Sequence, residues 1–443
     1  AATQLAPRRK PLSERIPRFY VPKPGQGSKS TSALSVSAQS EREELDRIFL
    51  GVGAGQGLTK EQLLAFTTKV CDLPSLFNAS LFAKLLLPPG TCAPSPGSEA
   101  EAAAAAPGAT VSREAVERYW TDFVRDQTPG ARLFHVLRDG NKQYVTRDDW
   151  RRHLASLLDT HPGLEFLKAT PEFQDRYLEC VVERIYYSNN RSDSGRLTLR
   201  EIEKSNLVKV MRLVDTESDI NKINDYFSYE HFYVLYCKFW ELDTDHDFLL
   251  DRDDVVKLGN YALTYRIVDR IFEGACRRLT SGTPDRLGYQ DFIWLLLSEE
   301  DKTSETALRY WFNGIDLDAD GCIRPYEMEF FYKEQLHRMD CLGQEVVQFA
   351  DMLCQMSDMV KPEVEGCVTL ADLRRCKQAG VLFNVLFNLT KFIQYDQRDP
   401  QLIFHERATP ELTDWDRYAK AEYARLSMEE EEGEAAAAAA AAA

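Results

Sequence analysis

The sequence predicts an all-α fold built from tandem helix–loop–helix pairs, with short two-stranded β links between paired loops. Two observations lead to this prediction. Apolar and aromatic side chains recur at the i, i+3 and i+4 spacing of helices from residue 112 to about residue 420, with little strict alternation. Polar loops with a common pattern, an aliphatic residue at position 8 and an acid at position 12, interrupt these helices.

Composition limits the function before any motif is considered. The 443 residues include 54 Lys and Arg against 70 Asp and Glu, a net charge of −16. This charge argues against nucleic acid or an anionic membrane as a partner of the folded part, because polyanions attract basic surfaces. Ten cysteines without a CxxC pair predict no disulfide framework. With no apolar run as long as a membrane span and no signal peptide, we expect a soluble protein of the nucleus and/or cytoplasm with reduced cysteines.

Residues 1–40 are expected to form a disordered basic arm. They hold seven Lys and Arg and one acid, and a composition rich in Ser, Pro and Gly buries too little apolar area to offset the entropy lost on ordering. Residues 16–22 are an apolar and aromatic island within the arm. This island is either linker or a docking peptide, in which Ile16, Phe19 and Tyr20 are the candidate partner-binding side chains.

Residues 41–87 regain helical periodicity and predict an N-terminal helical segment. The glycine-rich stretch at 51–57 lacks the preceding strand and the basic residue of a phosphate-binding loop. Leu58 and Gln62 fall at positions 8 and 12 of a frame that begins at Gly51, so this stretch is a candidate for a ruined member of the loop series. Residues 88–110, rich in Pro and Ala, are expected to be a linker.

Residues 316–327, the Asp316 loop, have the pattern of a calcium-binding EF-hand. Calcium takes about six to eight oxygens, which an EF-hand loop supplies from positions 1, 3, 5, 7, 9 and 12 around a turn glycine at position 6. Gly321 stands at position 6, and water has to serve position 9 because Arg324 offers no side-chain oxygen. The expected ligands are four carboxylates and one backbone carbonyl, those of Asp316, Asp318, Asp320, Glu327 and Cys322 respectively.

Residues 243–254, the Asp243 loop, predict a second site that departs from the pattern twice. Phe248 replaces the turn glycine, so the left-handed backbone expected there is strained. The acid at position 12 is Asp, so it either reaches the ion with one oxygen or pulls the loop tighter. Six acids in twelve residues repel one another without a cation. We therefore expect two Ca²⁺ ions in the protein, the one here bound more weakly or with more tolerance of Mg²⁺. The expected ligands are Asp243, Asp245, Asp247, Leu249 through its carbonyl, Asp251 and Asp254.

His246, at position 4 of the Asp243 loop, does not occupy a ligand position and is expected to be solvated. Four further loops keep positions 8 and 12 but have lost most ligands; they start at Arg138, Asn190, Thr280 and Lys361. The spacing of the loop starts pairs the first two in a degenerate EF-hand-like domain, 111–228. The other two pair with the Asp243 and Asp316 loops in a calcium-binding domain, 229–420.

EF-hands pair through position 8, so Leu250 should face Leu287 and Ile323 should face Val368. Each predicted ion therefore lies beside a degenerate loop. Calcium sensors instead pair two competent loops and open a Met-rich groove, and this chain has only seven Met. A structural or docking role for the ion is at least as well supported as a large opening.

Residues 421–443 begin with a run of glutamates and are expected to be an acidic, solvated tail. The sequence has no Gly-x-x-x-x-Gly-Lys-Ser/Thr phosphate loop, Gly-x-Ser-x-Gly elbow or His-Glu-x-x-His zinc helix. Ions whose coordination sphere is saturated leave no open position for chemistry. We therefore expect no enzymatic activity from this chain.

Three stretches carry a resemblance to a known family. Residues 177–187 (YLECVVERIYY), 227–243 (FSYEHFYVLYCKFWELD) and 310–312 (YWF) closely resemble the B'' regulatory subunits of protein phosphatase 2A, most of all the beta isoform. The resemblance covers roughly residues 112–427. The island at 16–22 is also similar to a segment near the N-terminus of that family.

The resemblance implies a non-catalytic subunit of a trimeric holoenzyme. Such a subunit contacts the HEAT-repeat scaffold and the catalytic subunit, recruits phosphoprotein substrates and is tuned by calcium through two working EF-hands. A role in the cell cycle and a place in the nucleus are expectations of the same kind. The alternative is a free-standing EF-hand calcium sensor or buffer that binds target peptides.

Overall fold

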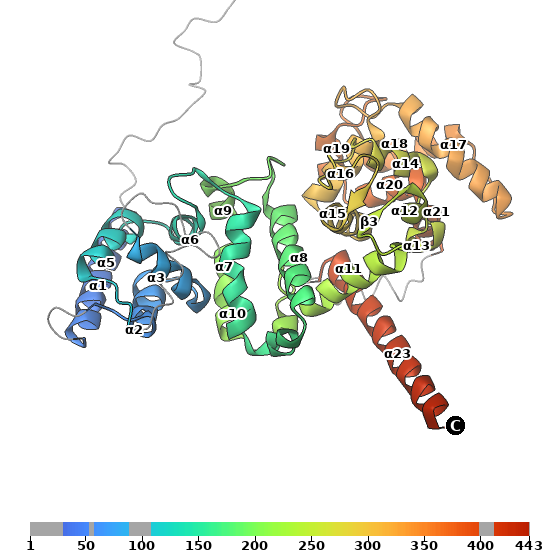
Figure 1. The fold of residues 1–443 in the computed structure, drawn as a ribbon. Helices are drawn as coiled ribbons and strands as arrows, with labels where there is room; N and C mark the ends of the chain where they lie inside the picture. Colours follow the sequence, from blue (N-terminus) through green and yellow to red (C-terminus); the bar gives the residue numbers. More distant parts are fainter. Residues whose placement is uncertain (1–29, 53–56, 88–107, 398–411, 443) are drawn as a thin grey trace, which may run out of the picture.

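The computed structural model describes residues 30–52, 57–87, 108–397 and 412–442. Within these ranges the chain is mostly helical, and the predicted all-α architecture of tandem EF-hand pairs is confirmed. The helix–loop–helix pairs follow one another along the molecule, from α1 at one end to the α14–α19 region at the other (Figure 1). None of the described helices combines the length and the apolar character that crossing a membrane requires.

The N-terminal pair was only partly foreseen from the sequence. Its helices are α1 (Ser30–Leu50), α2 (Lys60–Ala65), α3 (Asn78–Leu86) and α5 (Arg113–Tyr119). Leu58 forms an antiparallel bridge with Val111, with backbone hydrogen bonds of 2.9 Å in both directions. The bridge pairs Leu58 in the way expected for position 8 of the loop at Gly51, with Val111 as its partner. The segment 41–87 is therefore not a unit separate from residue 111 onward.

The second pair has the predicted partners. Its helices and strands are α6 (Pro129–Leu137), β1 (Tyr144–Val145), α7 (Arg147–Thr160), α8 (Pro171–Asn189), β2 (Leu197–Thr198) and α9 (Leu199–Lys204). Val145 lies opposite Leu197 in the antiparallel ladder. Each of α7 and α9 begins with a capping box, in which a Thr at position 9 and the acid at position 12 bond each other's backbone N–H. Helix α10 (Leu207–Thr216) follows.

The third and fourth pairs hold the two acidic loops. The third consists of α11 (Tyr229–Leu242), β3 (Leu249–Leu250), α12 (Arg252–Val256), α14 (Tyr265–Phe272), β4 (Leu287–Gly288) and α15 (Tyr289–Glu300). The fourth consists of α16 (Glu305–Ile315), α17 (Pro325–Cys341), α18 (Phe349–Val360) and α19 (Leu370–Arg375). Leu250 lies opposite Leu287 and Ile323 opposite Val368, so both predicted registers are confirmed.

Short helices connect or extend these pairs. They are α13 (Leu258–Tyr261), α20 (Ala379–Phe387), α21 (Leu389–Asp396), the π-helical turns η2 (Phe66–Val70) and η4 (Trp120–Val124), and the 3₁₀ turns η3 (Ser75–Phe77), η5 (Pro162–Ala169) and η6 (Ile220–Lys222). The buried apolar side chains form one continuous cluster from Leu45 to Leu426. The domain boundary expected at residue 228 does not divide this cluster. Contacts also span the expected boundary, since Glu183 on α8 accepts a 2.9 Å hydrogen bond from the Trp294 indole on α15.

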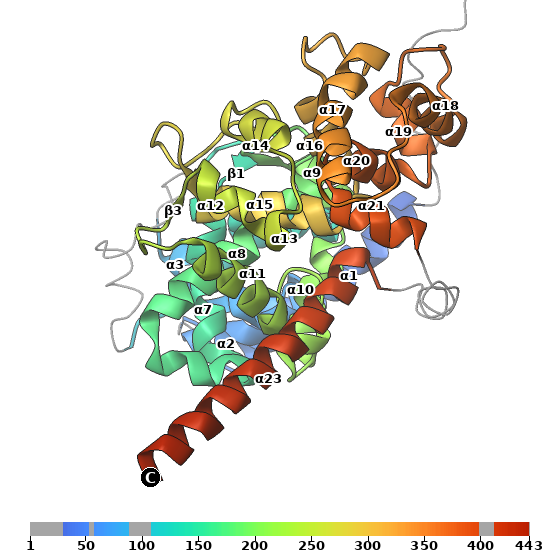
Figure 2. The same cartoon turned by 90° about the vertical axis from the view of Figure 1, so that its right-hand side faces the viewer.

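Both expected ends of the folded part need correction. Helix α1 begins at Ser30, inside the segment 1–40 that was expected to be a disordered arm. Helix α23 (Asp414–Ala442) crosses α11 (Figure 2) and continues well into the segment 421–443 that was expected to be a solvated tail. Leu426 is buried, and Glu422 pairs with Lys238 of α11 at 2.7 Å. The first part of the predicted tail is therefore a packed helix.

Candidate metal centre

The Asp316 loop gathers three carboxylates between α16 and α17. Ligand oxygens of Asp316, Asp318 and Asp320 all lie within 4.8 Å of one another. The Oδ2 of Asp316 accepts a 2.9 Å hydrogen bond from the backbone N–H of Gly321, whose φ of +82° closes the turn at position 6. The other oxygen, Oδ1, is buried and accepts no hydrogen bond from any described residue. A buried carboxylate oxygen without a donor is costly, and a cation would satisfy it.

Glu327 lies at position 12 with its side chain buried. Its Oε1 accepts a 2.6 Å hydrogen bond from the N–H of Leu317, and its Oε2 accepts one of 2.7 Å from the N–H of Arg324. Burial raises the pKa of Glu327, and these two backbone donors oppose that shift. Both oxygens that the sequence assigned to calcium are thus held at the loop by its own backbone.

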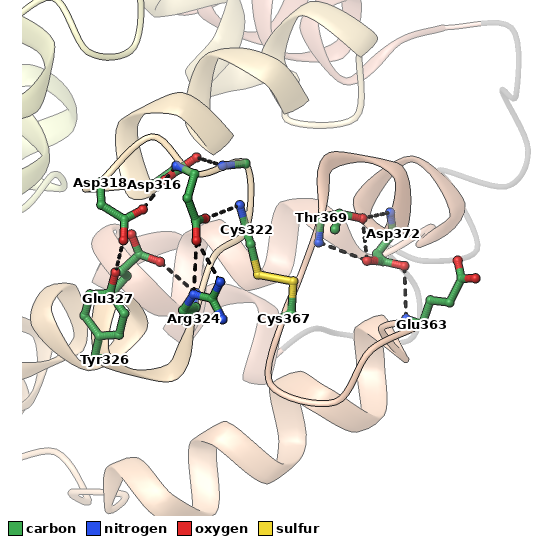
Figure 3. Close-up of a disulfide and its surroundings, with 12 residues drawn as sticks. Asp316, Asp318, Cys322, Arg324, Tyr326, Glu327, Glu363, Cys367, Thr369 and Asp372 are labelled. Atoms are coloured by element: carbon green, nitrogen blue, oxygen red, sulfur yellow. Dashed lines mark hydrogen bonds and ion pairs between the residues drawn. A yellow bond between two sulfur atoms is a disulfide. The ribbon is translucent and has the colours of Figure 1, made fainter. Parts of the chain in front are cut away.

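Arg324 and Tyr326 contact two of the ligand carboxylates, and these contacts were not predicted from the sequence. The Arg324 guanidinium at position 9 pairs with Asp320 at 2.7 Å. The Tyr326 hydroxyl donates to Asp318 Oδ2 at 2.5 Å, and this hydrogen bond lowers the pKa of Asp318 (Figure 3). Both interactions stabilise the ionised carboxylates that a divalent cation needs.

The Asp243 loop has the same arrangement at its first three ligand positions. Ligand oxygens of Asp243, Asp245 and Asp247 lie within 4.8 Å of one another. Asp243 Oδ2 accepts a 3.0 Å hydrogen bond from the Phe248 N–H, while the buried Oδ1 has no donor among the described residues. Burial raises the pKa of Asp243. The predicted strain is present, since Phe248 has a φ of +63°.

Packing holds Phe248 in this strained conformation. Its ring stacks on Phe239 with centroids 5.7 Å apart, and the Arg176 guanidinium lies 4.2 Å from its centroid. His246 is exposed, as expected, but it also stacks on Trp240 with ring centroids 4.0 Å apart. Aromatic packing thus stabilises the positive-φ turn of the Asp243 loop, whereas Gly321 makes the corresponding turn of the Asp316 loop without a side chain.

The remaining predicted ligands of the Asp243 loop are engaged elsewhere. Asp254 accepts a hydrogen bond from the Asp251 N–H at 3.2 Å and pairs with Lys257 at 3.0 Å. Asp251 accepts from the Asp254 N–H at 3.0 Å and pairs with Arg286 at 3.5 Å. The structure therefore brings together the carboxylates at positions 1, 3 and 5, but not those at 9 and 12.

The degenerate loops satisfy their position-12 acids with protein groups. Asp291 pairs with Arg277 at 2.9 Å, and the carboxylates of Asp149 and Asp372 pair with the arginines three residues further on. Glu201 instead accepts hydrogen bonds from Ser192 and Thr198. In three of these loops the position-12 carboxylate is thus neutralised by an arginine just outside the loop. The acidic loops contain a donor-free buried oxygen at position 1, which is the arrangement that fits calcium.

A disulfide joins Cys322 to Cys367, with the two Cα atoms 5.4 Å apart (Figure 3). The expectation that all cysteines are reduced is therefore wrong at this pair. Both residues occupy position 7 of paired loops, and this shared position was the signal in the sequence that could have revealed the pair.

The methionines are not scattered through the fold, although their small number counted against a Met-rich groove. Five of the seven lie on α17 and α18. Three of them, Met339, Met352 and Met359, line a groove of about 470 Å³ that α20 and α21 complete. Ile16, Phe19 and Tyr20 lie outside the described residues, as does most of the expected linker 88–110.

Comparisons with known proteins agree with this geometry. A family model described as an EF-hand domain matches residues 129–217, and one described as an EF-hand domain pair matches residues 232–333. The first match covers the degenerate loops at Arg138 and Asn190. The second covers the Asp243 and Asp316 loops.

Relatives of known name extend the similarity over most of the chain. The B''delta regulatory subunit of serine/threonine protein phosphatase 2A from Arabidopsis thaliana is 50% identical, over 85% of this chain and 68% of the relative. The human B'' alpha subunit is 40% identical over 95% of this chain and 35% of its own length. A solved structure described as a PP2A PR70 holoenzyme, with "diCa" in its description, contains a chain that is 46% identical to this one. The two superpose with a TM-score of 0.58, and the match covers 60% of this chain and 99% of the other. The chain therefore belongs to the B'' family of protein phosphatase 2A regulatory subunits.

Proposed function

We propose that this regulatory chain binds two calcium ions, one in each acidic loop, and that the ions fix the loops through which it takes part in a phosphatase complex. The chain is itself non-enzymatic, as its relatives are named regulatory subunits. The proposal depends on one observation above all. Asp243 and Asp316 each bury a carboxylate oxygen that no described residue satisfies.

The proposed ligands are those of the two sequence patterns. In the Asp316 loop they are the carboxylates of Asp316, Asp318, Asp320 and Glu327 and the carbonyl of Cys322. In the Asp243 loop, Asp243, Asp245 and Asp247 form the preassembled part of the site. Asp251, Asp254 and the carbonyl of Leu249 complete that site once Lys257 and Arg286 give way. Because this exchange costs two ion pairs, we expect the Asp243 loop to bind calcium more weakly.

The proposed partners are the HEAT-repeat scaffold and the catalytic subunit of protein phosphatase 2A, together with phosphoprotein substrates. The PR70 relative, described as part of a holoenzyme, supports this assignment. The chemistry then belongs to the catalytic chain. The regulatory chain raises the effective concentration of a bound phosphosite near that active site.

The test is reconstitution of the complex from purified scaffold, catalytic subunit and full-length chain, with calcium and with a chelator. We expect a trimeric complex by size-exclusion chromatography, and calorimetry should detect two calcium ions per chain. Glu327→Gln should remove one ion, with Glu329→Gln on the exposed face of α17 as the matched control. If the chain binds neither phosphatase subunit in either condition, the holoenzyme proposal is wrong. The free-standing sensor then becomes the better account, with the methionine groove as its peptide site.

Three finer proposals depend on the family resemblance. The likeness to the beta isoform is supported by the human B'' beta relative, 45% identical over 68% of this chain. A nuclear or cytoplasmic location and a role in the cell cycle are tested by imaging the tagged chain through division. The island 16–22 is tested by deleting residues 1–29, which leaves α1 whole. We expect weaker binding of a substrate or partner, and Ile16, Phe19 and Tyr20 substituted together by Ala should have the same effect.

A further inference from the structure

The disulfide between Cys322 and Cys367 lies inside the fourth helix–loop–helix pair, at the junction of its two loops. Next to it, Ile323 and Val368 exchange backbone hydrogen bonds of 2.9 and 3.0 Å. Cys322 is 5% exposed. The cross-link therefore connects the Asp316 loop to its degenerate partner at the place where their backbones already touch (Figure 3).

Position 7 side chains of paired loops are neighbours elsewhere in the molecule as well. In the second pair these residues are Tyr144 and Arg196, and the Arg196 guanidinium lies 4.5 Å from the Tyr144 ring centroid. The closeness of Cys322 and Cys367 is thus a property of the paired-loop geometry. Two cysteines at position 7 of paired loops are therefore close enough to form a disulfide.

The cross-link acts directly on a proposed calcium ligand. Cys322 offers its carbonyl at position 7, and its N–H donates to Asp320 Oδ1 at 2.8 Å. A covalent bond at Cys322 therefore restrains both the carbonyl ligand and the carboxylate at position 5.

The partner loop is a rigid anchor for this bond. Asp372 accepts hydrogen bonds from the backbone N–H groups of Thr369 and Glu363 at 2.9 and 3.2 Å, and Arg375 pairs with the same carboxylate. The Lys361 loop is thus closed by protein groups alone. Restraining a ligand loop against a closed one lowers the conformational entropy that ion binding has to remove.

We propose that Cys322 and Cys367 form a reversible redox modification site that sets the calcium affinity of the Asp316 loop. This inference rests on the proposed calcium binding of that loop. The oxidant class is a small disulfide, RSSR, such as glutathione disulfide. One cysteine thiolate attacks RSSR to give a mixed disulfide and one thiol RSH. The second cysteine then displaces the second RSH, so two electrons and both thiol protons pass from the protein to RSSR.

The Asp243 loop provides an internal control. Its position 7 is Leu249 and that of its partner is Arg286, so the third pair has no thiol at this junction. Oxidation should therefore change calcium binding at the Asp316 loop and leave the Asp243 loop unaffected.

The experiment compares the full chain equilibrated with glutathione disulfide and with dithiothreitol, each state checked by peptide mass spectrometry. Calcium is titrated by calorimetry in an Asp243→Ala background, in which the Asp316 loop alone reports. We expect the oxidised form to bind calcium about 5- to 10-fold more tightly than the reduced form. Cys367→Ser should stay at the reduced value under both conditions. Cys354→Ser, at an exposed free cysteine, should behave like the parent.

The outcomes separate this inference from the proposed function. Equal affinities in the oxidised and reduced parent overturn the redox inference and leave the metal site standing. Failure to detect the Cys322–Cys367 peptide after oxidation also overturns it. A folded chain that binds no calcium at the Asp316 loop in either state overturns the metal assignment, and the redox inference with it. Should Cys367→Ser misfold, the comparison of the two parent states still decides.

Discussion

The two acidic loops present the same three carboxylates on very differently built backbones. In the Asp316 loop, Gly321 makes the turn without strain from a side chain, and a disulfide ties the next residue to the partner loop. In the Asp243 loop, Phe248 makes the same turn at positive φ and is held by aromatic packing. The position of the ligands is thus set by the shared pattern, whereas the support differs. We therefore expect the two loops to differ in affinity and in what they are coupled to.

The largest expected effect tests whether position 12 completes one site and not the other. Glu327→Gln should weaken calcium binding to the Asp316 loop on the order of 100-fold, because the bidentate carboxylate becomes a neutral amide. Asp254→Asn should cost the Asp243 loop only about tenfold, since Asp254 is already paired with Lys257. Calorimetry on both variants measures the contrast. Equal losses would show that the two sites are completed in the same way.

The second prediction concerns the packing of α23 on α11, the helix that leads into the Asp243 loop. His231 on α11 accepts hydrogen bonds at Nδ1 from the Trp415 indole at 3.2 Å and from Arg184 at 2.8 Å, and Asp416 lies 3.9 Å from its Nε2. Burial, followed by the Arg184 charge, lowers the pKa of His231 from 6.5 to about 2. The neutral ring is therefore the folded form, and only the unfolded chain takes up a proton as the pH falls through 6.5.

Protonation of His231 in the unfolded chain does not affect the free energy of unfolding above pH 6.5. Below that pH it lowers the free energy of unfolding progressively, by about 2 kcal/mol at pH 5. Denaturant unfolding of the parent and of His231→Gln at pH 7.5 and 5 should show a smaller loss in the variant. His153→Gln should reduce the loss in the same direction without touching α23, because burial also lowers the pKa of His153 on α7. The assignment to His231 fails if the parent and His231→Gln lose the same free energy of unfolding between pH 7.5 and pH 5.

The third prediction attempts to make the weaker site more like the stronger one. Asp254→Glu restores the longer acid at position 12 and should raise calcium affinity of the Asp243 loop by about tenfold, with a smaller gain for Mg²⁺. Titrations with each ion measure both. Asp253→Glu, a neighbour outside the ligand positions, should leave both affinities unchanged. An unchanged calcium-to-magnesium ratio in Asp254→Glu would place the limit at Phe248 instead.

The smallest expected effect isolates the backbone. A Cβ added at Gly321 meets no atom within 4 Å, so Gly321→Ala introduces strain at positive φ and no clash. We expect a loss of about 1 kcal/mol in the free energy of unfolding, measured by denaturant titration without calcium. Gly314→Ala is a contrasting control, because its Cβ would lie 2.6 Å from the Cys276 sulfur and should cost more through overlap.

The elements that the sequence predicted are those that depend on local spacing. Position-8 registers such as Leu250 with Leu287 follow from pattern alone, and they are confirmed. The packing of α23 on α11 could not be predicted from local spacing, because Trp415 and His231, which are in contact, are 184 residues apart in the sequence. The arginines of the degenerate loops fall between these cases. Arg375 stands three residues after Asp372 and was visible as a pattern, but its role required knowing where the carboxylate points.

Helix α23 also has a mechanical consequence. Its 29 residues correspond to a rod of roughly 43 Å at the rise of an α-helix, and its first part is strapped to α11, which leads into the Asp243 loop. A rotation of α11 by about 10 degrees would carry the far end of such a rod through roughly 7 Å. Any rotation of α11 would therefore be amplified along α23 into a larger displacement at its far end.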